Sequence, residues 1–406
     1  MTAVADAITT KMTYPKQDNP TTQQTNNHGF FSMVLLTLGH FISDFYNNFL
    51  PGLLPAIIAG LGMSLTTSGL LVMVYAITSS ITQPFLGYCM DKNGYSWLIL
   101  FTFPASAVFI CTTTLVPNIP VLFAFVILAG IGSALFHPLG SSMMGKITPL
   151  AHKGIAIALF IGGGNVGFAI APAVVIYFIF QYGLDSLPWL VIPAFALTIA
   201  YYMKNIHRIP IAVTSNQNSE NAPVWYKTPG IIKLNVVMGL RSWAHVAIPT
   251  FLPVWIVQQG QSPTLAANMI TVFLVGGAIG SVIGGYFGDR FGRKNTILWS
   301  LFLCVPALYL FLNSSVTASN AWILLFISGA ALLSAMPSSV VWAQEMMPDN
   351  AAMASGMMMG FAYGLGGLGA AITGAMADVI GLHSAFLFTV IPLAFSIPLV
   401  YSIPKK

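Results

Sequence analysis

Two pairs of ionisable residues interrupt long apolar stretches of the sequence. His40 and Asp44 stand four residues apart in one stretch, and Arg241 and His245 stand four residues apart in another. Residues with this spacing share one face of a helix. Ionisable side chains inside a membrane span are costly and commonly have a function there. We therefore take these four residues as candidates for proton transfer or ligand binding.

Asp44 is the main candidate for proton coupling, with His40 tuning or sharing its proton. Burial favours the protonated form of a carboxyl group, whereas a nearby arginine favours the ionised form. A carrier that changes the distance between Asp44 and Arg241 would thus change its proton affinity. One charge crossing the membrane is worth about 2.3 kcal/mol per 100 mV, enough to drive substrate accumulation. The alternative is a structural role, in which Asp44 only satisfies a helix contact.

Arg241 has two principal candidate roles. Its guanidinium could bind a phosphonate, phosphate or carboxylate group through paired hydrogen bonds, or it could pair with Asp44, and the two roles can alternate. His137 precedes Pro138, which removes a backbone hydrogen bond and exposes carbonyl groups. The other candidates for a substrate-binding cavity are polar or aromatic, and simple packing is the alternative for each of them: His245, His137, Asn165, Tyr75, Gln83, Trp243 and Tyr363.

The composition places these residues in a membrane protein. Of 406 residues, 56% are hydrophobic and only 6% are charged, and the mean hydropathy is +0.80. Soluble domains carry about 25% charged residues, so most of this surface must face lipid. A spanning helix needs about 20 apolar residues. Twelve such runs are present, at about 31–59, 68–90, 97–116, 119–142, 154–179, 187–206, 230–258, 265–287, 295–312, 319–341, 351–377 and 382–402.

The placement of basic residues predicts the orientation of these spans. Apart from Arg241 inside the seventh span, all Lys and Arg fall in the termini and the even-numbered loops, or at helix ends beside them, while the odd-numbered loops contain none. Such residues concentrate on the cytoplasmic side, so we expect a multi-pass protein of the inner (plasma) membrane with both termini in the cytoplasm. Residues 1–29 are predicted to be a disordered cytoplasmic tail. The polar segment 207–229 is predicted to be a cytoplasmic linker between bundles at 30–206 and 230–406.

An internal repeat supports two similar halves. Pro51 in the first span has a counterpart in Pro249, and Pro55 has one in Pro253, each 198 residues later. Parallel repeats of this kind place a pseudo-twofold axis along the membrane normal, with a central site between the halves. We therefore predict an all-α membrane protein whose twelve helices form two pseudo-symmetric six-helix bundles.

A second repeated pattern, Gly-Asp-Gly, follows the second span of each half. Glycines permit a tight turn, and the aspartate can accept from a helix N-terminus or pair with an arginine. We interpret the loops as a cytoplasmic gate, with Glu345 as either a partner or an interfacial charge. Ordinary cytoplasmic charge would explain the basic residues but not the repeated spacing. The gate residues are Gly87, Asp91, Gly285, Asp289, Arg290, Gly292, Arg293 and Glu345.

These motifs resemble a known family. The loop at 288–294 is similar to the helix 2–3 signature of the major facilitator superfamily. The stretches at 40–44, 136–138, 163–165 and 343–369 resemble the fosmidomycin-resistance branch of its drug exporters. The resemblance implies the major facilitator fold and a carrier driven by the proton gradient, with no cofactor. It further implies export of a small molecule or drug, including anionic compounds, by proton antiport.

One departure from the family pattern leaves the transport direction open. Antiporters often carry Gly-x-x-x-Gly-Pro in the fifth helix, whereas this sequence has Ala171 in place of the second glycine. The alternative is therefore a proton-coupled symporter that imports an organic anion. We expect the partners to be the substrate, protons and the lipid bilayer, with no nucleic acid, and the protein to be a monomer.

The residue types argue against catalysis and against a metal centre. The sequence contains no His-Glu-x-x-His motif, no nucleophile elbow and no cluster with metal-ligand spacing. The cysteines are spaced neither for a metal nor for a disulfide framework, and we expect them to be small buried apolar groups: Cys89, Cys111 and Cys304. We therefore expect a carrier and not an enzyme.

Overall fold

The computed structural model describes residues 22–83, 85–86, 89, 94–148, 153–209, 228–347, 354 and 356–404. All regular structure within these ranges is helical. The first half contains α1 (Thr22–Asn47), α2 (Leu50–Leu61), α3 (Leu65–Ala76) continued by the π-helical turn η1 (Ile77–Ile81), α5 (Ile99–Cys111), α6 (Ile119–Ile147), α7 (Lys153–Tyr182) and α8 (Ile192–Met203). The second half contains α9 (Pro229–Gln258), α10 (Pro263–Phe291), α11 (Arg293–Leu312), α12 (Ser319–Met346), the π-helical turn η9 (Met357–Phe361), α14 (Ala362–Ile380) and α15 (Leu382–Tyr401).

The number of spans agrees with the sequence. Within the described residues, 11 helices are long and apolar enough to cross a membrane, and Leu65–Ile81 is a shorter apolar helix. This shorter helix occupies the start of the run predicted at 68–90, whose end lies partly outside the described residues. The predicted all-α class with apolar spanning helices in two bundles is therefore confirmed.

Three predicted features lie partly or wholly outside the described residues: the tail, the linker and the first copy of the gate. Helix α1 begins at Thr22, so it includes residues 22–29, which we had assigned to the tail. Residues 1–21 of the tail and residues 210–227 of the linker lie outside the described residues. The same is true of Gly87 and Asp91 in the first copy of the predicted gate.

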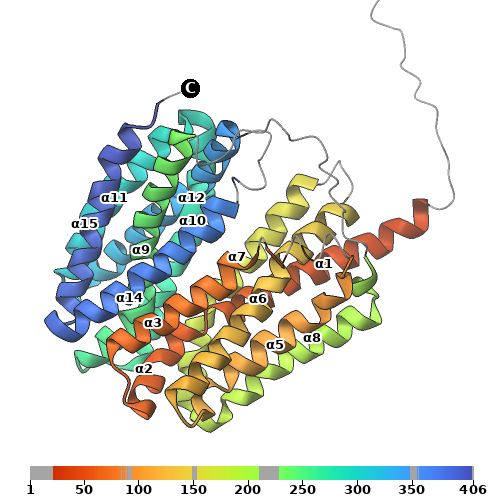
Figure 1. Ribbon diagram of the computed structural model, residues 1–406, viewed down its shortest axis with the longest axis horizontal. Helices are drawn as coiled ribbons and strands as arrows, with labels where there is room; N and C mark the ends of the chain where they lie inside the picture. Colours follow the sequence, from red (N-terminus) through yellow and green to blue (C-terminus); the bar gives the residue numbers. More distant parts are fainter. Residues whose placement is uncertain are drawn as a thin grey trace, which may run out of the picture.

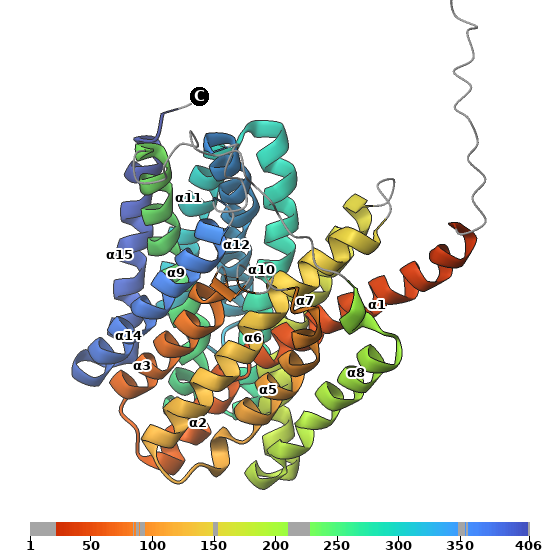
Figure 2. The same cartoon turned by 45° about the vertical axis from the view of Figure 1, so that its right-hand side comes forward.

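The two halves lie side by side, and most of their contacts are made by three helix pairs. Helix α3 packs on α14, α2 on α9, and α7 on α10. In Figure 1 the first half runs from red to green and the second from green to blue, and α3 and α14 run alongside each other. We call the side where α15 ends the terminal face and the other side the opposite face. In Figure 2, α1 and α7 lean away from α12 and α15 towards the terminal face.

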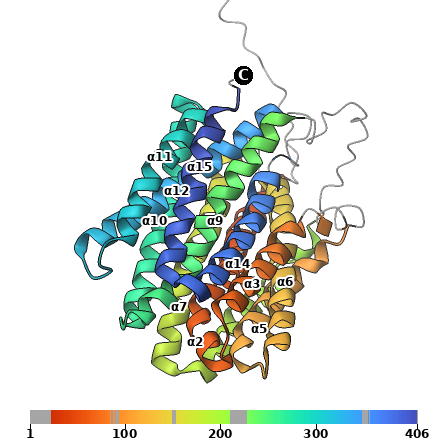
Figure 3. The same ribbon diagram turned by 60° about the vertical axis from the view of Figure 1, so that its left-hand side comes forward.

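Close glycine contacts set the packing within the second half. A Cβ atom on Gly280 of α10 would lie 2.0 Å from the backbone oxygen of Ala330 in α12, and one on Gly284 would lie 2.0 Å from that of Ser334. Small residues at four-residue spacing let membrane helices approach to backbone contact. Helices α10 and α12 are accordingly neighbours along their lengths (Figure 3).

The first span is broken at its polar centre. Helix α1 ends at Asn47, and α2 begins at Leu50 with Pro51 in its first turn, where a proline needs no N–H partner. Asn48 lies in the break, and its side-chain Nδ2 donates to the backbone oxygen of Phe168 in α7 at 2.8 Å. The break therefore lies about one helical turn beyond Asp44.

Candidate functional site: a histidine–aspartate cluster beside a central cavity

Asp44 lies between two histidine side chains. His40 Nε2 is 3.2 Å from Asp44 Oδ2, and His137 Nε2 is 3.3 Å from Asp44 Oδ1. The side chain of Asp44 is 14% exposed. His40 and Asp44 share a face of α1, as their spacing predicts, whereas His137 comes from α6. Each carboxylate oxygen is thus engaged by a different imidazole.

The hydrogen bonding of His40 limits where this cluster can carry protons. His40 Nδ1 is 2.8 Å from the backbone oxygen of Phe160 in α7. A carbonyl oxygen can only accept, so Nδ1 carries a hydrogen. In a neutral imidazole Nε2 would then be a bare acceptor facing a carboxylate. A hydrogen bond between His40 and Asp44 therefore requires one further proton, on one residue or the other.

Gly164 of α7 makes room for this cluster. A Cβ atom at this position would lie 2.5 Å from Asp44 Oδ2 and 2.6 Å from His40 Nε2. Neighbouring Asn165 is half-buried on the same helix. The close approach explains why a glycine is needed here, and the Gly-Gly-Gly run in the sequence is the signal that could have indicated it.

The same three side chains form a group that could hold a metal ion, because their ligand atoms all lie within 4.8 Å of one another. Two histidines and one carboxylate are a ligand set that transition metals accept. Hydrogen bonds from the two imidazoles would also account for both contacts of Asp44, so the geometry fits either protons or a metal ion.

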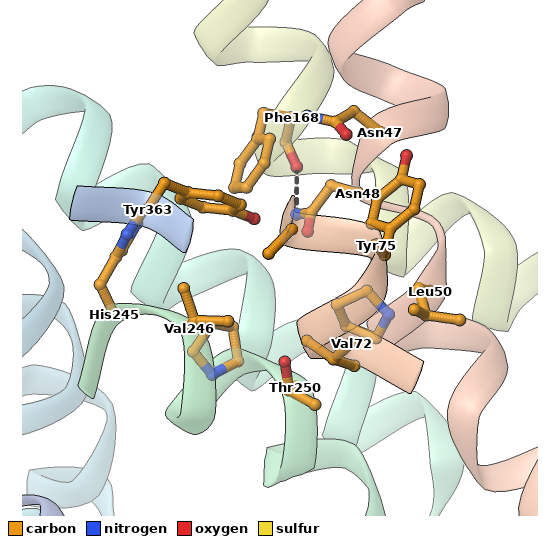
Figure 4. Close-up of a pocket in the computed structure, with 13 residues that line it drawn as sticks. Asn47, Asn48, Leu50, Val72, Tyr75, Phe168, His245, Val246, Thr250 and Tyr363 are labelled. Atoms are coloured by element: carbon orange, nitrogen blue, oxygen red, sulfur yellow. Dashed lines mark hydrogen bonds between the residues drawn. The ribbon is translucent and has the colours of Figure 1, made fainter. Parts of the chain in front are cut away.

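A small cavity lies between the halves next to this cluster. Its volume is about 20 Å³, measured as the space open to the centre of a water molecule, and this is room for about one water. Figure 4 shows Tyr75 and Tyr363 pointing into it from opposite sides. The lining residues come from six helices and the break between α1 and α2: Asn47, Asn48, Leu50, Pro51, Val72, Tyr75, Ala76, Phe168, His245, Val246, Pro249, Thr250 and Tyr363.

Two polar atoms near the cavity are buried without a partner among the described residues. They are Asn47 Oδ1 and the hydroxyl of Tyr75. Buried polar groups in native proteins are nearly always hydrogen-bonded to protein, water or ligand. The cavity is therefore built to receive a polar occupant. In this conformation the cavity is too small for anything larger than about one water molecule.

Arg241 neither pairs with Asp44 nor lines the cavity in this structure, and its hydrogen-bond partner is a backbone carbonyl group. It is only 1% exposed. Its Nε donates to the backbone oxygen of Leu332 in α12 at 2.6 Å, and its Nη1 is 3.9 Å from the sulfur of Met336. Its Nη2 has no partner within the described residues. Among the described residues, the ion-pair partners of Asp44 are the two histidines and not Arg241.

The remaining predicted cavity residues divide between lining and packing. His245 lines the cavity, with its ring centroid 6.1 Å from that of Tyr363. Trp243 instead donates from Nε1 to Thr373 Oγ1 at 2.8 Å, which ties α9 to α14. Gln83 donates to the backbone oxygen of Ser79 in its own helix at 2.6 Å.

The described copy of the predicted gate joins three helices of one half. Arg293 Nη1 is 2.5 Å from Asp289 Oδ1, and Arg293 Nε is 3.4 Å from Glu345 Oε1, so the end of α10 and the start of α11 are linked to α12. Gly292 has a φ of 87°, the positive-φ turn that favours glycine. Arg290 Nη1 instead donates to the hydroxyl of Tyr286 at 3.0 Å. Gly285 faces α12, where a Cβ atom would lie 3.8 Å from Pro337 Cβ.

One polar contact between the halves was missed by the sequence reasoning. Asp378, at the end of α14, accepts hydrogen bonds from the first turn of α3 at the opposite face. The sequence showed Asp378 only as an acidic residue near an odd-numbered loop. Two of its three hydrogen-bond donors are backbone N–H groups, which almost every residue carries, so the residue types did not indicate this contact.

Comparisons with known proteins agree with this architecture. The sequence profile of the Major Facilitator Superfamily matches residues 36–241 and 234–406. The chain is 29% identical over 374 residues to the fosmidomycin resistance protein of Escherichia coli (strain K12), covering 88% of each chain. It is 28% identical over 381 residues to the uncharacterized transporter YfnC of Bacillus subtilis (strain 168), covering 90% of this chain and 92% of the relative. The multidrug resistance protein 1 of Bacillus subtilis (strain 168) is 23% identical over 355 residues, with 85% and 89% covered.

Solved structures share the fold at low sequence identity. A bacterial homolog of the human lysosomal transporter Spinster, in an inward-facing and unoccupied conformation, superposes with a TM-score of 0.77 at 15% identity, covering 93% of this chain and 97% of that one. The nucleoside transporter NupG superposes with a TM-score of 0.68 at 16% identity, covering 92% and 98%. The chain therefore belongs to the Major Facilitator Superfamily, as a multi-pass membrane transporter that resembles the fosmidomycin-resistance type.

Proposed function

We propose that this transporter is a proton-coupled exporter of a small molecule or drug that works by alternating access. The observation that carries the proposal is Asp44 held between His40 and His137 at the edge of the central cavity. In this proposal the terminal face is cytoplasmic and the opposite face is extracellular. The drug-resistance names of the Escherichia coli and Bacillus subtilis relatives support export.

The coupling follows from the geometry of the cluster. In this proposal His40 and Asp44 of α1 share a proton at Nε2, while His40 bonds the Phe160 carbonyl of α7 through Nδ1. Loss of that proton leaves a carboxylate facing a bare imidazole nitrogen, which favours separation of these side chains. Protonation and the arrangement of α1, α6 and α7 are therefore linked, and a substrate in the adjacent cavity competes with or responds to the same rearrangement.

The environment of Arg241 supports an anionic substrate class. A buried guanidinium nitrogen without a hydrogen-bond partner costs free energy because it has lost its water, and a hydrogen bond to a ligand oxygen would offset that cost. His245 is one helical turn away on α9 and already lines the cavity. Arg241 can then exchange the Leu332 carbonyl for a phosphonate, phosphate or carboxylate once the cavity widens.

The second candidate function is a proton-coupled symporter that imports an organic anion. The observation behind it is that Arg241 and the His40–Asp44 cluster would serve an importer equally well. The replacement of a motif glycine by Ala171 favours keeping this alternative. The two functions differ in the sign of proton movement that accompanies the substrate.

The test is proton movement in vesicles containing the purified protein and a luminal pH dye, with fosmidomycin as the first probe. Substrate added outside should make the lumen more alkaline for an antiporter and more acidic for a symporter. Asp44→Asn should abolish this movement while labelled substrate still exchanges across the membrane. Asp185→Asn, at an exposed site in the loop before α8, is the matched control. Full proton movement in Asp44→Asn would reject Asp44 as the coupling residue.

A further inference from the structure

We infer that Asp378 and the first turn of α3 form a latch that holds the two halves together at the opposite face. The inference takes its naming of the faces from the proposed function, in which this side is extracellular. The contact joins α14 of the second half to α3 of the first, and three hydrogen bonds make it. Leu65 N donates to Asp378 Oδ1 at 2.9 Å, while Thr66 N and Thr66 Oγ1 donate to Oδ2 at 2.8 and 2.6 Å.

The start of α3 depends on the other half for its hydrogen bonding. The first N–H groups of any helix lack partners within the helix. Ser64 supplies two of them, because its Oγ accepts from Thr67 N at 3.1 Å and its carbonyl oxygen accepts from Ser68 N at 3.0 Å. The N–H groups of Leu65 and Thr66 remain, and both are satisfied by Asp378. The negative carboxylate also faces the positive end of the helix dipole.

Close packing beside the latch makes it specific for the closed arrangement. A Cβ atom on Gly374 of α14 would lie 2.2 Å from the backbone oxygen of Leu65, and one on Gly69 of α3 would lie 2.7 Å from that of Ala370. The two backbones are therefore nearly in contact within two turns of Asp378. A small separation of α3 from α14 would break all three hydrogen bonds together.

The latch stands between the cavity and the opposite face. Val72 and Tyr75 of α3 line the cavity about two to three turns deeper than Thr66, and Thr250 lines it from α9. A substrate that leaves on this side must pass where α3 and α14 now touch. Asp378 is exposed, so water replaces its bonds readily when the halves part. The contact is thus a reversible latch that biases the equilibrium towards the closed opposite face.

The test measures how fast a buried cavity residue becomes accessible from outside. Thr250→Cys is placed in a full-length chain whose Cys89, Cys111 and Cys304 are replaced by serine. A membrane-impermeant maleimide is added outside intact cells. With Asp378→Asn the labelling rate should rise about three- to tenfold, the range expected from losing a charge at a helix terminus and weakening exposed hydrogen bonds. Asp185→Asn, the same charge change on an exposed residue near the same face, should leave the rate unchanged.

A second variant removes the donor instead of the acceptor. Leu65→Pro deletes one latch N–H, and a proline is compatible with the first helical position after the extended Ser64. It should also raise the labelling rate, and the double variant with Asp378→Asn should add less than the sum of the two effects. Size-exclusion chromatography confirms that each variant is folded, and either variant alone suffices if the other is not.

The outcomes separate this latch from the proposed function. An unchanged labelling rate in the folded variants, or an equal rise in Asp185→Asn, overturns the latch whatever the proton measurements give. Gln259→Cys, an exposed residue at the opposite face, reports orientation independently. If it reacts only from the cytoplasmic side, the assignment of the latch to the extracellular face is overturned. Failure of Asp44→Asn to affect proton movement rejects the coupling proposal and leaves the labelling result standing.

Discussion

A methyl group added at Gly164 would collide with the histidine–aspartate cluster. In Gly164→Ala the new carbon would lie 2.5 Å from Asp44 Oδ2, about 0.9 Å inside the 3.4 Å at which ordinary contact begins. Moving the carboxylate by that amount takes the 3.2 Å contact with His40 beyond hydrogen-bonding distance. Overpacking costs about 1–3 kcal/mol, while replacing a helical glycine by alanine returns up to about 1 kcal/mol. The protein should therefore fold, with a displaced cluster.

We expect Gly164→Ala to lose proton coupling while the amount of folded protein stays close to that of the wild type. Misplacing a reacting group by about 1 Å can cost about a hundredfold in rate, so substrate-driven proton movement in Gly164→Ala should fall at least tenfold. Gly162→Ala is the matched control, because it lies two residues away on α7 and its Cβ atom would meet nothing within 4 Å. The assay is proton movement in vesicles per amount of folded protein, with labelled-substrate exchange measured in parallel.

Two results would refute this reasoning. Wild-type proton movement in Gly164→Ala would show that the cluster tolerates displacement and is not the coupling site. An equal loss in Gly162→Ala would show that α7 responds to any added side chain. Loss of exchange together with proton movement would indicate general disruption of the carrier.

Two further predictions address the second half. Arg241→Lys should weaken transport of an anionic substrate much more than that of a neutral one, since a lysine cannot make paired hydrogen bonds; competition assays with both substrates test this, and equal effects would count against direct recognition. Gly280→Ala should lower the thermal stability of the detergent-solubilised protein, because its Cβ atom would lie 2.0 Å from the backbone oxygen of Ala330. Gly60→Ala, whose Cβ atom meets nothing within 4 Å, should melt like the wild type, and similar melting of both variants would contradict the packing argument.

Properties that depend on local order along the chain were accessible from the sequence. Apolar length predicted the spans, and the 198-residue repeat predicted two halves. The four-residue spacing of His40 and Asp44 placed them on one helix face, and the structure brings them to 3.2 Å. These inferences succeed because helical periodicity and membrane thickness act on a single segment, without reference to its neighbours.

Properties that depend on which helix faces which were decided only by the tertiary structure. The sequence did not indicate that His137 would reach Asp44 from α6, that Arg241 would turn to the Leu332 carbonyl, or that Asp378 would satisfy the start of α3. Each depends on how a helix is rotated about its axis and how closely its backbone approaches another. Backbone contacts at glycines set that rotation and distance, and partners such as carbonyl and N–H groups are the same at every residue.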